Sequence, residues 1–346
     1  MNQINLGQIN SELKKSPPEK DQYYFGHGKL LLTGEYFVLD GALALALPTK
    51  VGQSLSVKYT PSFSPTLSWK SYDVNGNIWF DSEFEFWHFK CLDENPSEEA
   101  LFLQKILQQV RKQNSHFLRD NVDVKVETRL GFPLTWGLGS SSSLIYNIAQ
   151  WAYISPFELL FKTHGGSGYD IACAQSDGPI AYKKGSSGPS FSPIYFNPDF
   201  KKNLYFVYLG VKQNSREAVK EYTKKRPIDP AMITKITELT QEFLNAQTIK
   251  QFQTLMVQHE EIISTTLDLP MIKEQFADFS GAIKSLGAWG GDFVLAATEN
   301  DFDYVRSYFG AKGLDTVYRY SDLISEPFEA QSKDSVKMGF SNHLLH

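Results

Sequence analysis

The chain has 346 residues, of which 42% are hydrophobic and 21% are charged, a balance typical of a folded globular protein with room for two domains. Its 39 acidic residues outnumber its 34 basic residues and give a net charge of −5, so no nucleic-acid partner is expected. No apolar run reaches the length of a membrane span, the N-terminus has no secretory signal, and two cysteines suit a reducing compartment. We therefore expect a cytoplasmic enzyme with no membrane partner.

The first half of the chain is predicted to alternate strands and helices. Residues 1–21 are polar and are expected to form a mobile extension. Strands are expected within residues 23–59 and 69–87, the second region being interrupted by the hairpin turn Asn75-Gly76-Asn77. The elements expected next, in order, are a helix over 97–113, a strand over 122–126, and helices over 144–151 and 156–162.

The second half is predicted to form a separate unit. A loop at residues 185–189 is rich in Gly and Ser and marks the expected junction between an N-terminal domain (22–188) and a C-terminal domain (189–346). Asn214 to Glu217 has the pattern of a capping box that opens a helix. The other elements expected are a strand over 204–211, helices over 217–224, 233–244 and 252–267, and a strand over 293–298. The pattern predicts a two-domain α+β protein.

The most informative segment joins the expected strand at 122–126 to the helix at 144–151. Its sequence is Gly137-Leu138-Gly139 followed by four serines, 140–143. Glycines let the backbone approach a phosphate closely, and the N-terminus of a helix directs free N–H groups toward an anion. The segment matches neither a Walker A loop nor a Rossmann fingerprint. Taken alone, it is as typical of a turn that caps a helix as of a phosphate cradle.

Three further segments accompany this loop: Gly28 to Gly41 (which contains Gly-Lys-Leu-Leu-Leu-Thr-Gly-Glu-Tyr), Gly166 to Ala172 (Gly-Ser-Gly-Tyr-Asp-Ile-Ala) and Gly287 to Asp292 (Gly-Ala-Trp-Gly-Gly-Asp). In this order, the four segments resemble the signature of the GHMP kinases, and within that superfamily they are most similar to mevalonate kinase and phosphomevalonate kinase. The resemblance implies a ribosomal S5 domain 2-like N-terminal domain, a ferredoxin-like α+β C-terminal domain, and an active site in the cleft between them.

The resemblance also implies a reaction, in which the γ-phosphoryl group of ATP, bound with Mg²⁺, passes to an alcohol or phosphate of a small acidic acceptor. Asp170 would accept or orient the hydroxyl proton, and Lys29 beside it would lower the pKa of that carboxyl and stabilise developing charge. Without the resemblance, Asp170 is typical of an Asx turn and Lys29 of a solvated strand start. The implied ATP-binding residues are Gly137, Leu138, Gly139, Ser140, Ser141 and Ser142.

The metal and acceptor residues follow from the same resemblance. Ser141 is implied as an Mg²⁺ ligand, whereas first-turn helix chemistry is the preferred interpretation of Ser142 and Ser143. Glu158, twelve positions before Asp170, is a candidate second ligand or else a solvated glutamate at a helix start. The implied acceptor-binding residues are Glu35, Tyr36, Ser167, Gly168, Arg216, Gly290, Gly291 and Asp292. Of these, Glu35 and Tyr36 could instead brace the cleft, and Arg216 suits a carboxylate because its guanidinium binds bidentately.

The identity of the acceptor stays open at this stage. Gly-Glu-Tyr and Gly-Gly-Asp favour phosphomevalonate, while the Val211 to Arg216 segment favours mevalonate, which we place slightly ahead. Trp136 and Trp289 stand where the family has small residues and could reshape the pocket. A sugar or homoserine kinase, a decarboxylase of the same fold and a catalytically silent binding protein are the alternatives. The sequence does not decide whether the chain forms a homodimer.

Overall fold

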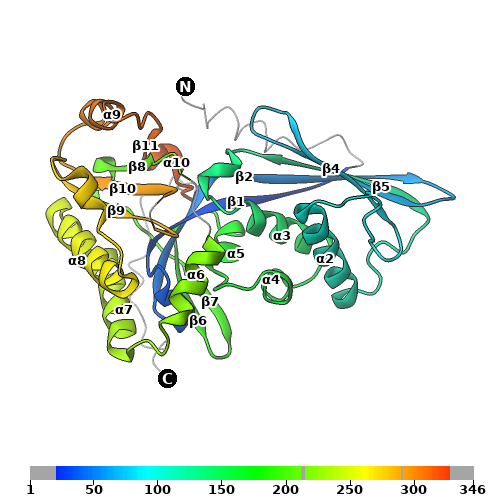
Figure 1. Cartoon of the computed structure of the whole chain (residues 1–346), viewed down its shortest axis with the longest axis horizontal. Coiled ribbons are helices and arrows are strands. Elements are labelled where there is room, and N and C mark those ends of the chain that lie inside the picture. Colours follow the sequence, from blue (N-terminus) through cyan, green and yellow to red (C-terminus); the bar gives the residue numbers. More distant parts are fainter. Residues whose placement is uncertain (1–20, 212–214, 290, 328–346) are drawn as a thin grey trace, which may run out of the picture.

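The computed structural model describes residues 21–211, 215–289 and 291–327. The expected mobile extension therefore lies outside the described residues, apart from its last position. The described residues form two β-sheets, one of seven strands and one of four, each packed against helices (Figure 1). No helix in this part of the chain is long and apolar enough to cross a membrane. The mixed α+β class predicted from the sequence is confirmed.

The larger sheet is built around two long N-terminal strands, β1 (Gln22–Thr33) and β2 (Ala44–Pro61), which pair antiparallel. The strand order is β4-β3-β5-β2-β6-β7, with β1 also paired to β2, and only β3 and β5 run parallel among the described pairs. The remaining strands are β3 (Thr66–Tyr72), β4 (Ile78–Glu85), β5 (Val122–Leu130), β6 (Ile180–Gly185) and β7 (Gly188–Pro193).

Helices pack against one face of this sheet. They are α2 (Glu98–Gln113), α3 (Ser140–Trp151), α4 (Pro156–Thr163) and α5 (Tyr169–Ala174). Ile106 of α2 and Ile148 of α3 are buried with Leu55 and Trp69 of the sheet in one hydrophobic cluster. The helix expected at 144–151 begins earlier, at Ser140, because Gly139 adopts a left-handed conformation (φ 86°) that ends the preceding loop directly before the serines.

The smaller sheet is antiparallel, with the order β11-β8-β10-β9. Helices precede β9 and β11 in the chain, so the sheet has the ferredoxin-like arrangement that was expected for the C-terminal region. The strands are β8 (Leu204–Tyr208), β9 (Ala282–Ser285), β10 (Phe293–Ala297) and β11 (Val317–Arg319). The helices are α6 (Ser215–Lys224), α7 (Pro230–Asn245), α8 (Ile249–Leu267), α9 (Phe302–Gly310) and α10 (Tyr320–Leu323), with 3₁₀ turns η1 (Phe37–Asp40), η2 (Leu134–Trp136), η3 (Asp199–Asn203) and η4 (Ile272–Phe276).

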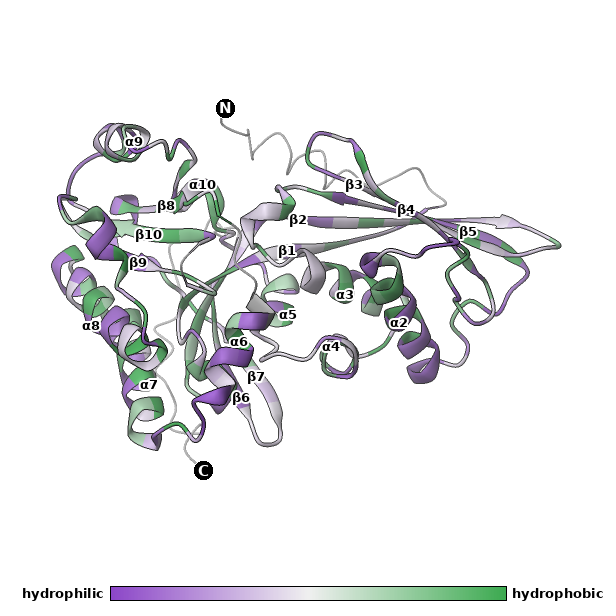
Figure 2. Cartoon of the chain, in the orientation of Figure 1, coloured by the Kyte–Doolittle hydropathy of each residue, from purple (hydrophilic) through white to green (hydrophobic). Residues whose placement is uncertain are grey.

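Both faces of the smaller sheet are covered. Successive residues of a strand point to opposite faces, so Phe206 joins the cluster that contains Phe243 and Phe252 of α7 and α8, while Val207 joins the cluster under α9 and η4. β10 is accordingly hydrophobic along most of its length (Figure 2). The first of these clusters also contains Leu45 and Leu47 of β2, so one continuous core joins the two sheets.

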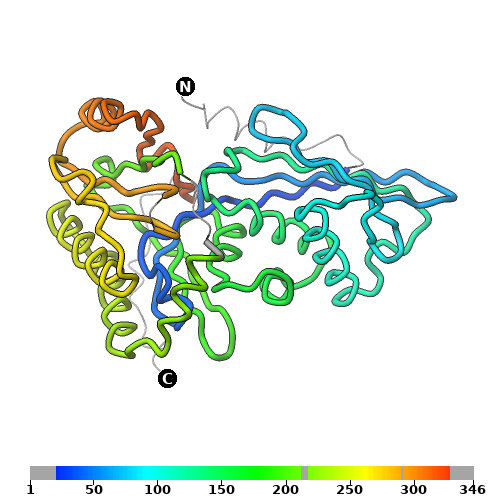
Figure 3. The backbone as a smooth tube through the Cα atoms, viewed as in Figure 1, coloured from blue at the N-terminus to red at the C-terminus, as the bar shows by residue number. Residues whose placement is uncertain are grey.

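Two expected boundaries change. The loop at 185–189 is the turn of the β6–β7 hairpin, and residues up to Pro193 still pair with β6, so this loop does not separate the two sheets. The strand expected over 204–211 ends at Tyr208, because the chain turns at Gly210, whose φ of 79° is left-handed. The backbone trace shows the segment between β1 and β2 lying beside the turn that connects β9 to β10 (Figure 3), where Tyr36 bonds to Ala288.

Candidate functional site

A cavity of about 770 Å³ lies where the four motif segments meet. Each segment contributes lining residues, although the segments are separated by more than 250 residues of chain at the extremes. The motif residues that line it are Lys29, Leu31, Tyr36, Val38 and Leu39, Gly137 to Ser142, Gly166, Ser167, Tyr169 and Asp170, and Gly287, Ala288 and Asp292. The tertiary structure therefore gathers most of the predicted site residues around one space.

The Gly137–Gly139 loop packs tightly against two of the other segments. Gly137 has a φ of 64°, and a Cβ atom there would clash with the carboxylate of Asp292. A Cβ atom on Gly139 would lie 3.0 Å from Cγ of Lys29, whose backbone N–H donates to the carbonyl of Leu138 (2.9 Å). The loop requires glycine at both positions because the first and last motifs occupy the space of a side chain.

The four serines that follow have different roles. Ser140 and Ser141 line the cavity, and within the described residues their hydroxyls have no hydrogen-bond partner in the protein. Ser142 also lines it, but its hydroxyl donates to Oδ2 of Asp170. Ser143 is buried and donates to Oε1 of Gln53 (3.0 Å). First-turn chemistry alone therefore does not describe Ser142, and its predicted contact with ATP competes with its bond to Asp170.

Asp170 and Lys29 lie close together at the cavity wall. Asp170 is in the first turn of α5, and its Oδ1 accepts the N–H of Ile171 (3.1 Å), a local bond of the kind expected for a helix-start aspartate. Burial disfavours the charge on Lys29, but Tyr169, Asp292 and Asp170 outweigh it and raise its pKa above the usual value. Lys29 is therefore held in its charged form by the nearby acidic groups, and its predicted pairing with Asp170 stays a prediction.

Tyr36 joins the first motif to the last. Its hydroxyl donates to the carbonyl of Ala288 (2.8 Å), and both residues line the cavity. Asp292 has a left-handed φ of 53°, and its backbone is held by bonds to Leu209 and Val211. This segment is thus held by the residues that directly follow β8 on one side and by Tyr36 on the other.

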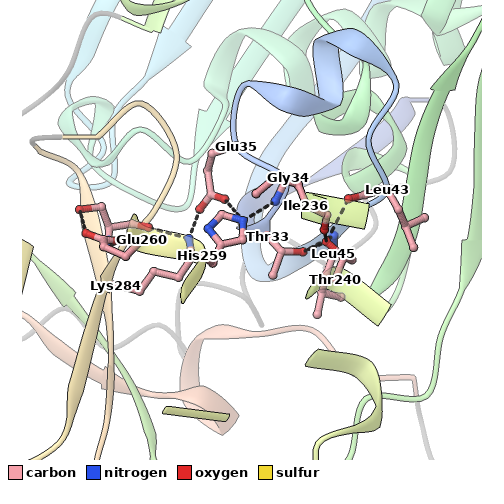
Figure 4. A network of polar contacts seen from close by, with 11 residues as sticks. Thr33, Gly34, Glu35, Leu43, Leu45, Ile236, Thr240, His259, Glu260 and Lys284 are labelled. Carbon is pink, nitrogen blue, oxygen red and sulfur yellow. Dashed lines mark hydrogen bonds and ion pairs between the residues drawn. The ribbon is translucent and has the colours of Figure 1, made fainter. Parts of the chain in front are cut away.

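Some predicted residues lie away from the cavity lining. Glu35 is buried, pairs with Lys284 and does not line the cavity, an arrangement that fits the alternative interpretation of a brace (Figure 4). Glu158 is half-exposed and pairs with Lys162, because Leu159 and Leu160 direct α4 into the core. Glu158 does not line the cavity, and its role as a metal ligand stays a prediction.

The remaining predicted acceptor residues divide in two. Gly168 is the N-cap of α5 with a φ of 95°, and a Cβ atom there would lie 2.9 Å from the hydroxyl of Tyr182, so its role is to shape the turn. Gly291 is buried and does not line the cavity. Gly290 and the side chain of Arg216 lie outside the described residues, although Arg216 belongs to α6.

The two unusual tryptophans are buried and do not line the cavity. Trp136 packs against Tyr208, Phe293 and Tyr318 in the core that joins the sheets. Trp289 belongs to a separate cluster with Tyr36 and Tyr222, among others. The expectation that they reshape the pocket directly is therefore not met, because both side chains point into hydrophobic cores.

Sequence reasoning missed two basic residues of the lining, His164 and Lys220. Lys220 lies on α6, a helix that is largely hydrophilic on its exposed side (Figure 2). It follows Arg216 by four positions, the spacing that places two residues on the same face of a helix. That spacing was the available signal, since the sequence analysis had already assigned Arg216 to the acceptor.

The oxygen atoms at the cavity suit a cation shared with phosphates. Within the described residues, no group of three or more His, Cys, Asp or Glu side chains is arranged to hold a metal ion alone. Ser141, Asp170 and Asp292 nevertheless offer oxygen donors to the cavity. Mg²⁺ prefers oxygen, keeps several waters and commonly takes only one or two protein ligands when phosphates complete its shell. These residues therefore fit Mg²⁺ bound together with a nucleotide.

Comparison with known proteins places this geometry in a known fold. No family model matches the sequence, and no curated protein matches it by sequence. Among solved structures, the chain is similar to L. major mevalonate kinase in complex with R-mevalonate (17% identity, TM-score 0.65, covering 90% of this chain and 99% of that one). It is also similar to Streptococcus pneumoniae phosphomevalonate kinase in complex with phosphomevalonate and AMPPNP (18%, 0.64, 86% and 99%) and to Lactococcus lactis galactokinase complexed with galactose (13%, 0.61, 90% and 96%).

The chain therefore has the fold of the GHMP kinases. The three neighbours named above share this fold, with TM-scores between 0.61 and 0.65, and are in complex with different small molecules. The fold alone therefore does not distinguish one acceptor from another.

The first prediction concerns the buried carboxyl of Glu35. Burial raises its pKa to about 7, and attraction to Lys284 opposes this rise only in part. The folded protein therefore holds this proton more tightly than the unfolded chain, so the contribution to stability is complete below pH 4.5 and is lost as the pH rises to 7. Glu35→Gln should remove that loss, up to about 1.4 kcal/mol per pH unit.

The measurement is the free energy of unfolding in urea at pH 5 and pH 7 for both proteins. The buried neighbours His259 and Glu260 are present in both, so their titration largely cancels in the difference. Glu158→Gln, at an exposed ion pair, is the control and should leave the pH dependence unchanged. Parallel curves for Glu35→Gln and the wild type would contradict a raised pKa at Glu35.

Proposed function

We propose that this protein is an ATP-dependent small-molecule kinase of the GHMP type, which transfers the γ-phosphoryl group to a small acidic acceptor. One observation carries the proposal: the Gly137–Ser141 loop, Asp170 and Lys29 line the same cavity. Phosphoryl transfer requires a clamp for the phosphates, charge stabilisation and an oriented hydroxyl. These residues supply all three in one place.

Each residue has a role that its chemistry supports. The loop and the N-terminus of α3 present backbone N–H groups and the hydroxyls of Ser140 and Ser141 to phosphate oxygens. Asp170 orients the acceptor hydroxyl and accepts its proton, while the ammonium of Lys29 stabilises the charge that develops. Mg²⁺, bound with ATP near Ser141, would supply further neutralisation of the phosphate charge.

The charges at the cavity support an acidic acceptor. Lys220 lines the cavity from α6, and among the described residues no ion pair engages its ammonium group. Arg216 on the same helix remains the proposed partner of the acceptor carboxylate. We place mevalonate first. Phosphomevalonate is the second candidate, because Lys29 and Lys220 together give two ammonium groups for an acceptor that carries two anionic groups.

The experiment that tests the function is an ADP-release assay with ATP and Mg²⁺ against mevalonate, phosphomevalonate, homoserine and galactose. Turnover with one of the two acids is expected. Turnover with galactose or homoserine alone would support the proposed kinase activity and contradict the proposal of an acidic acceptor of the mevalonate type. No turnover with any alcohol, despite ATP binding, would favour a silent binding protein.

The second prediction is that Asp170→Asn lowers kcat by about 10²–10⁴-fold, because proton transfer to a positioned carboxylate is worth that much. ATP binding should survive, since the phosphate loop is intact. The control is Asp177→Asn, an exposed residue shortly after α5 that does not line the cavity and should leave kcat unchanged. A kcat of Asp170→Asn within tenfold of wild type would contradict the proposed role of Asp170 as the proton acceptor.

The third prediction separates two neighbouring hydroxyls. Ser141→Ala should raise the Mg²⁺ concentration needed for half-maximal rate by roughly tenfold, the usual loss for a hydrogen bond or ligand to a charged group. Ser140→Ala should change it much less, because only Ser141 is proposed to touch the cation. Titration of the rate with Mg²⁺ at saturating ATP provides the comparison. Equal shifts of the half-maximal Mg²⁺ concentration in the two variants would contradict the proposal that Ser141 is the Mg²⁺ ligand.

The fourth prediction concerns the acceptor. Lys220→Met should raise the acceptor KM by roughly 10- to 100-fold, the cost of one charge-assisted bond, and leave the ATP KM nearly unchanged. Lys224→Met is the matched control, since Lys224 lies one turn further along α6, pairs with Glu221 and does not line the cavity. A larger change in the ATP KM than in the acceptor KM would place Lys220 at the nucleotide instead.

A further inference from the structure

A cluster of four buried ionisable side chains lies next to the cavity and plays no part in the chemistry described above. Glu35 precedes η1, His259 and Glu260 are neighbours on α8, and Lys284 lies in β9 (Figure 4). The side chains of Glu35 and Lys284 are fully buried, and the ammonium of Lys284 donates to Oε1 of Glu35. The contact is an ion pair once Glu35 is deprotonated, at a pH above its raised pKa of about 7. The cluster spans the interface between the segment that follows β1 and the smaller sheet.

The contacts within the cluster hold both segments by their backbones. On one side, Nε2 of His259 accepts the N–H of Gly34 (3.0 Å), so the imidazole is neutral with its proton on Nδ1, and it lies 3.3 Å from Oε2 of Glu35. Burial and Lys284 also lower the pKa of His259 well below its usual value. On the other side, Glu260 accepts the N–H (2.9 Å) and the hydroxyl (3.1 Å) of Ser285.

Stability alone does not account for an ion pair at this position. Removing two charges from water costs several kcal/mol for each ion, and well-packed apolar side chains of similar volume commonly stabilise a fold as well or better. An ion pair differs from such a contact in being directional, because its geometry satisfies only one arrangement of the two chains. Lys284 also donates to the carbonyl of Ser285 (2.9 Å), which orients its ammonium group.

The two chains joined by this pair are walls of the cavity. Glu35 immediately precedes Tyr36, and Lys284 lies three positions before Gly287. Tyr36 and Ala288 are joined by a second bond, from hydroxyl to carbonyl, between the same two segments. The ion pair and this bond link the same two segments at two points. Together they set the distance between the Tyr36 wall and the wall that carries Asp292.

We propose that Glu35 and Lys284 are positioning residues, whose buried ion pair sets the spacing between the Tyr36 wall and the Gly287–Asp292 wall for phosphoryl transfer. The proposal rests on the kinase function proposed above. A displacement of about 1 Å in such a wall can cost about 10²-fold in rate. The pair does not contact the phosphate loop, which meets this wall where Gly137 packs against Asp292. The larger effect is therefore expected on kcat and the acceptor KM, and the smaller one on the ATP KM.

The test removes both charges at once. Glu35→Met/Lys284→Met replaces two unbranched side chains by two of similar length and removes both members of the pair together. Glu260 loses the nearby ammonium group but keeps its hydrogen bonds to Ile272 and Ser285. We expect kcat to fall at least tenfold, with the ATP KM within threefold of wild type and the urea midpoint close to that of the control. The control is Thr240→Val, which removes a buried hydroxyl that joins α7 to Thr33 (2.9 Å) at the same interface but touches no cavity residue.

A second readout does not depend on activity. Amide hydrogen exchange in residues 34–41 and 285–289 should accelerate at least tenfold in the double variant and not in Thr240→Val. If the wild type phosphorylates none of the acceptors, the proposed function fails, and the exchange data still decide whether the pair holds the two walls. A double variant with kcat within twofold of wild type and unchanged exchange would overturn the positioning role.

A conservative variant provides the rescue. Glu35→Gln keeps an oxygen acceptor for Lys284, so at neutral pH it should retain at least threefold more of the wild-type kcat than the double variant. Glu35→Gln also provides a test by itself if the double variant does not fold. In Glu35→Gln, amide exchange in residues 34–41 should be faster than in the wild type at neutral pH. Protection of those amides equal to wild type in Glu35→Gln, together with wild-type kcat, would reject the ion pair as the determinant of spacing.

Discussion

The packing of β2 into both sheets is the constraint on which the cavity depends. Leu45 and Leu47 lie in the same hydrophobic cluster as Phe206, Phe243 and Phe252, so the strand that supports the first motif is fixed against the strands and helices of the C-terminal region. Burial of apolar surface supplies the free energy of this arrangement but is not directional. The polar contacts at the interface therefore decide which of the many apolar packings is adopted.

Charge inside the site is arranged around Lys29. The ammonium group lies among Tyr169, Asp292 and Asp170, which keep it protonated in spite of its burial. Asp170 is held in turn by the hydroxyl of Ser142 and by the first turn of α5. A carboxylate, a cation and two hydroxyls that have no partner within the described residues line one cavity. The proposed phosphoryl transfer rests on this arrangement, because such groups can hold a phosphate and an alcohol close together.

Local patterns predicted the elements well where side-chain period or turn chemistry decides the structure. Helix α2, capped by Ser97, and the β3–β4 hairpin follow directly from such signals. Boundaries failed where backbone conformation or pairing decides them, as at the early start of α3 and at the β6–β7 turn. The position of Glu158 in the sequence likewise did not indicate where its side chain lies. The burial of Leu159 and Leu160 turns α4 so that Glu158 is half-exposed and pairs with Lys162.

The sequence by itself determined the four motif segments and the α+β class, because these depend on local residue type and spacing. The candidate roles of Asp170, Lys29 and Ser141 came from the resemblance of those segments to a known family. Only the tertiary structure decided that Glu35 braces the cleft, that the hydroxyl of Ser142 donates to Asp170, and that Lys220 lines the cavity. The physical reason is that each of these roles requires a partner distant in the chain. Lys284 lies 249 positions from Glu35, and no local pattern encodes such a contact.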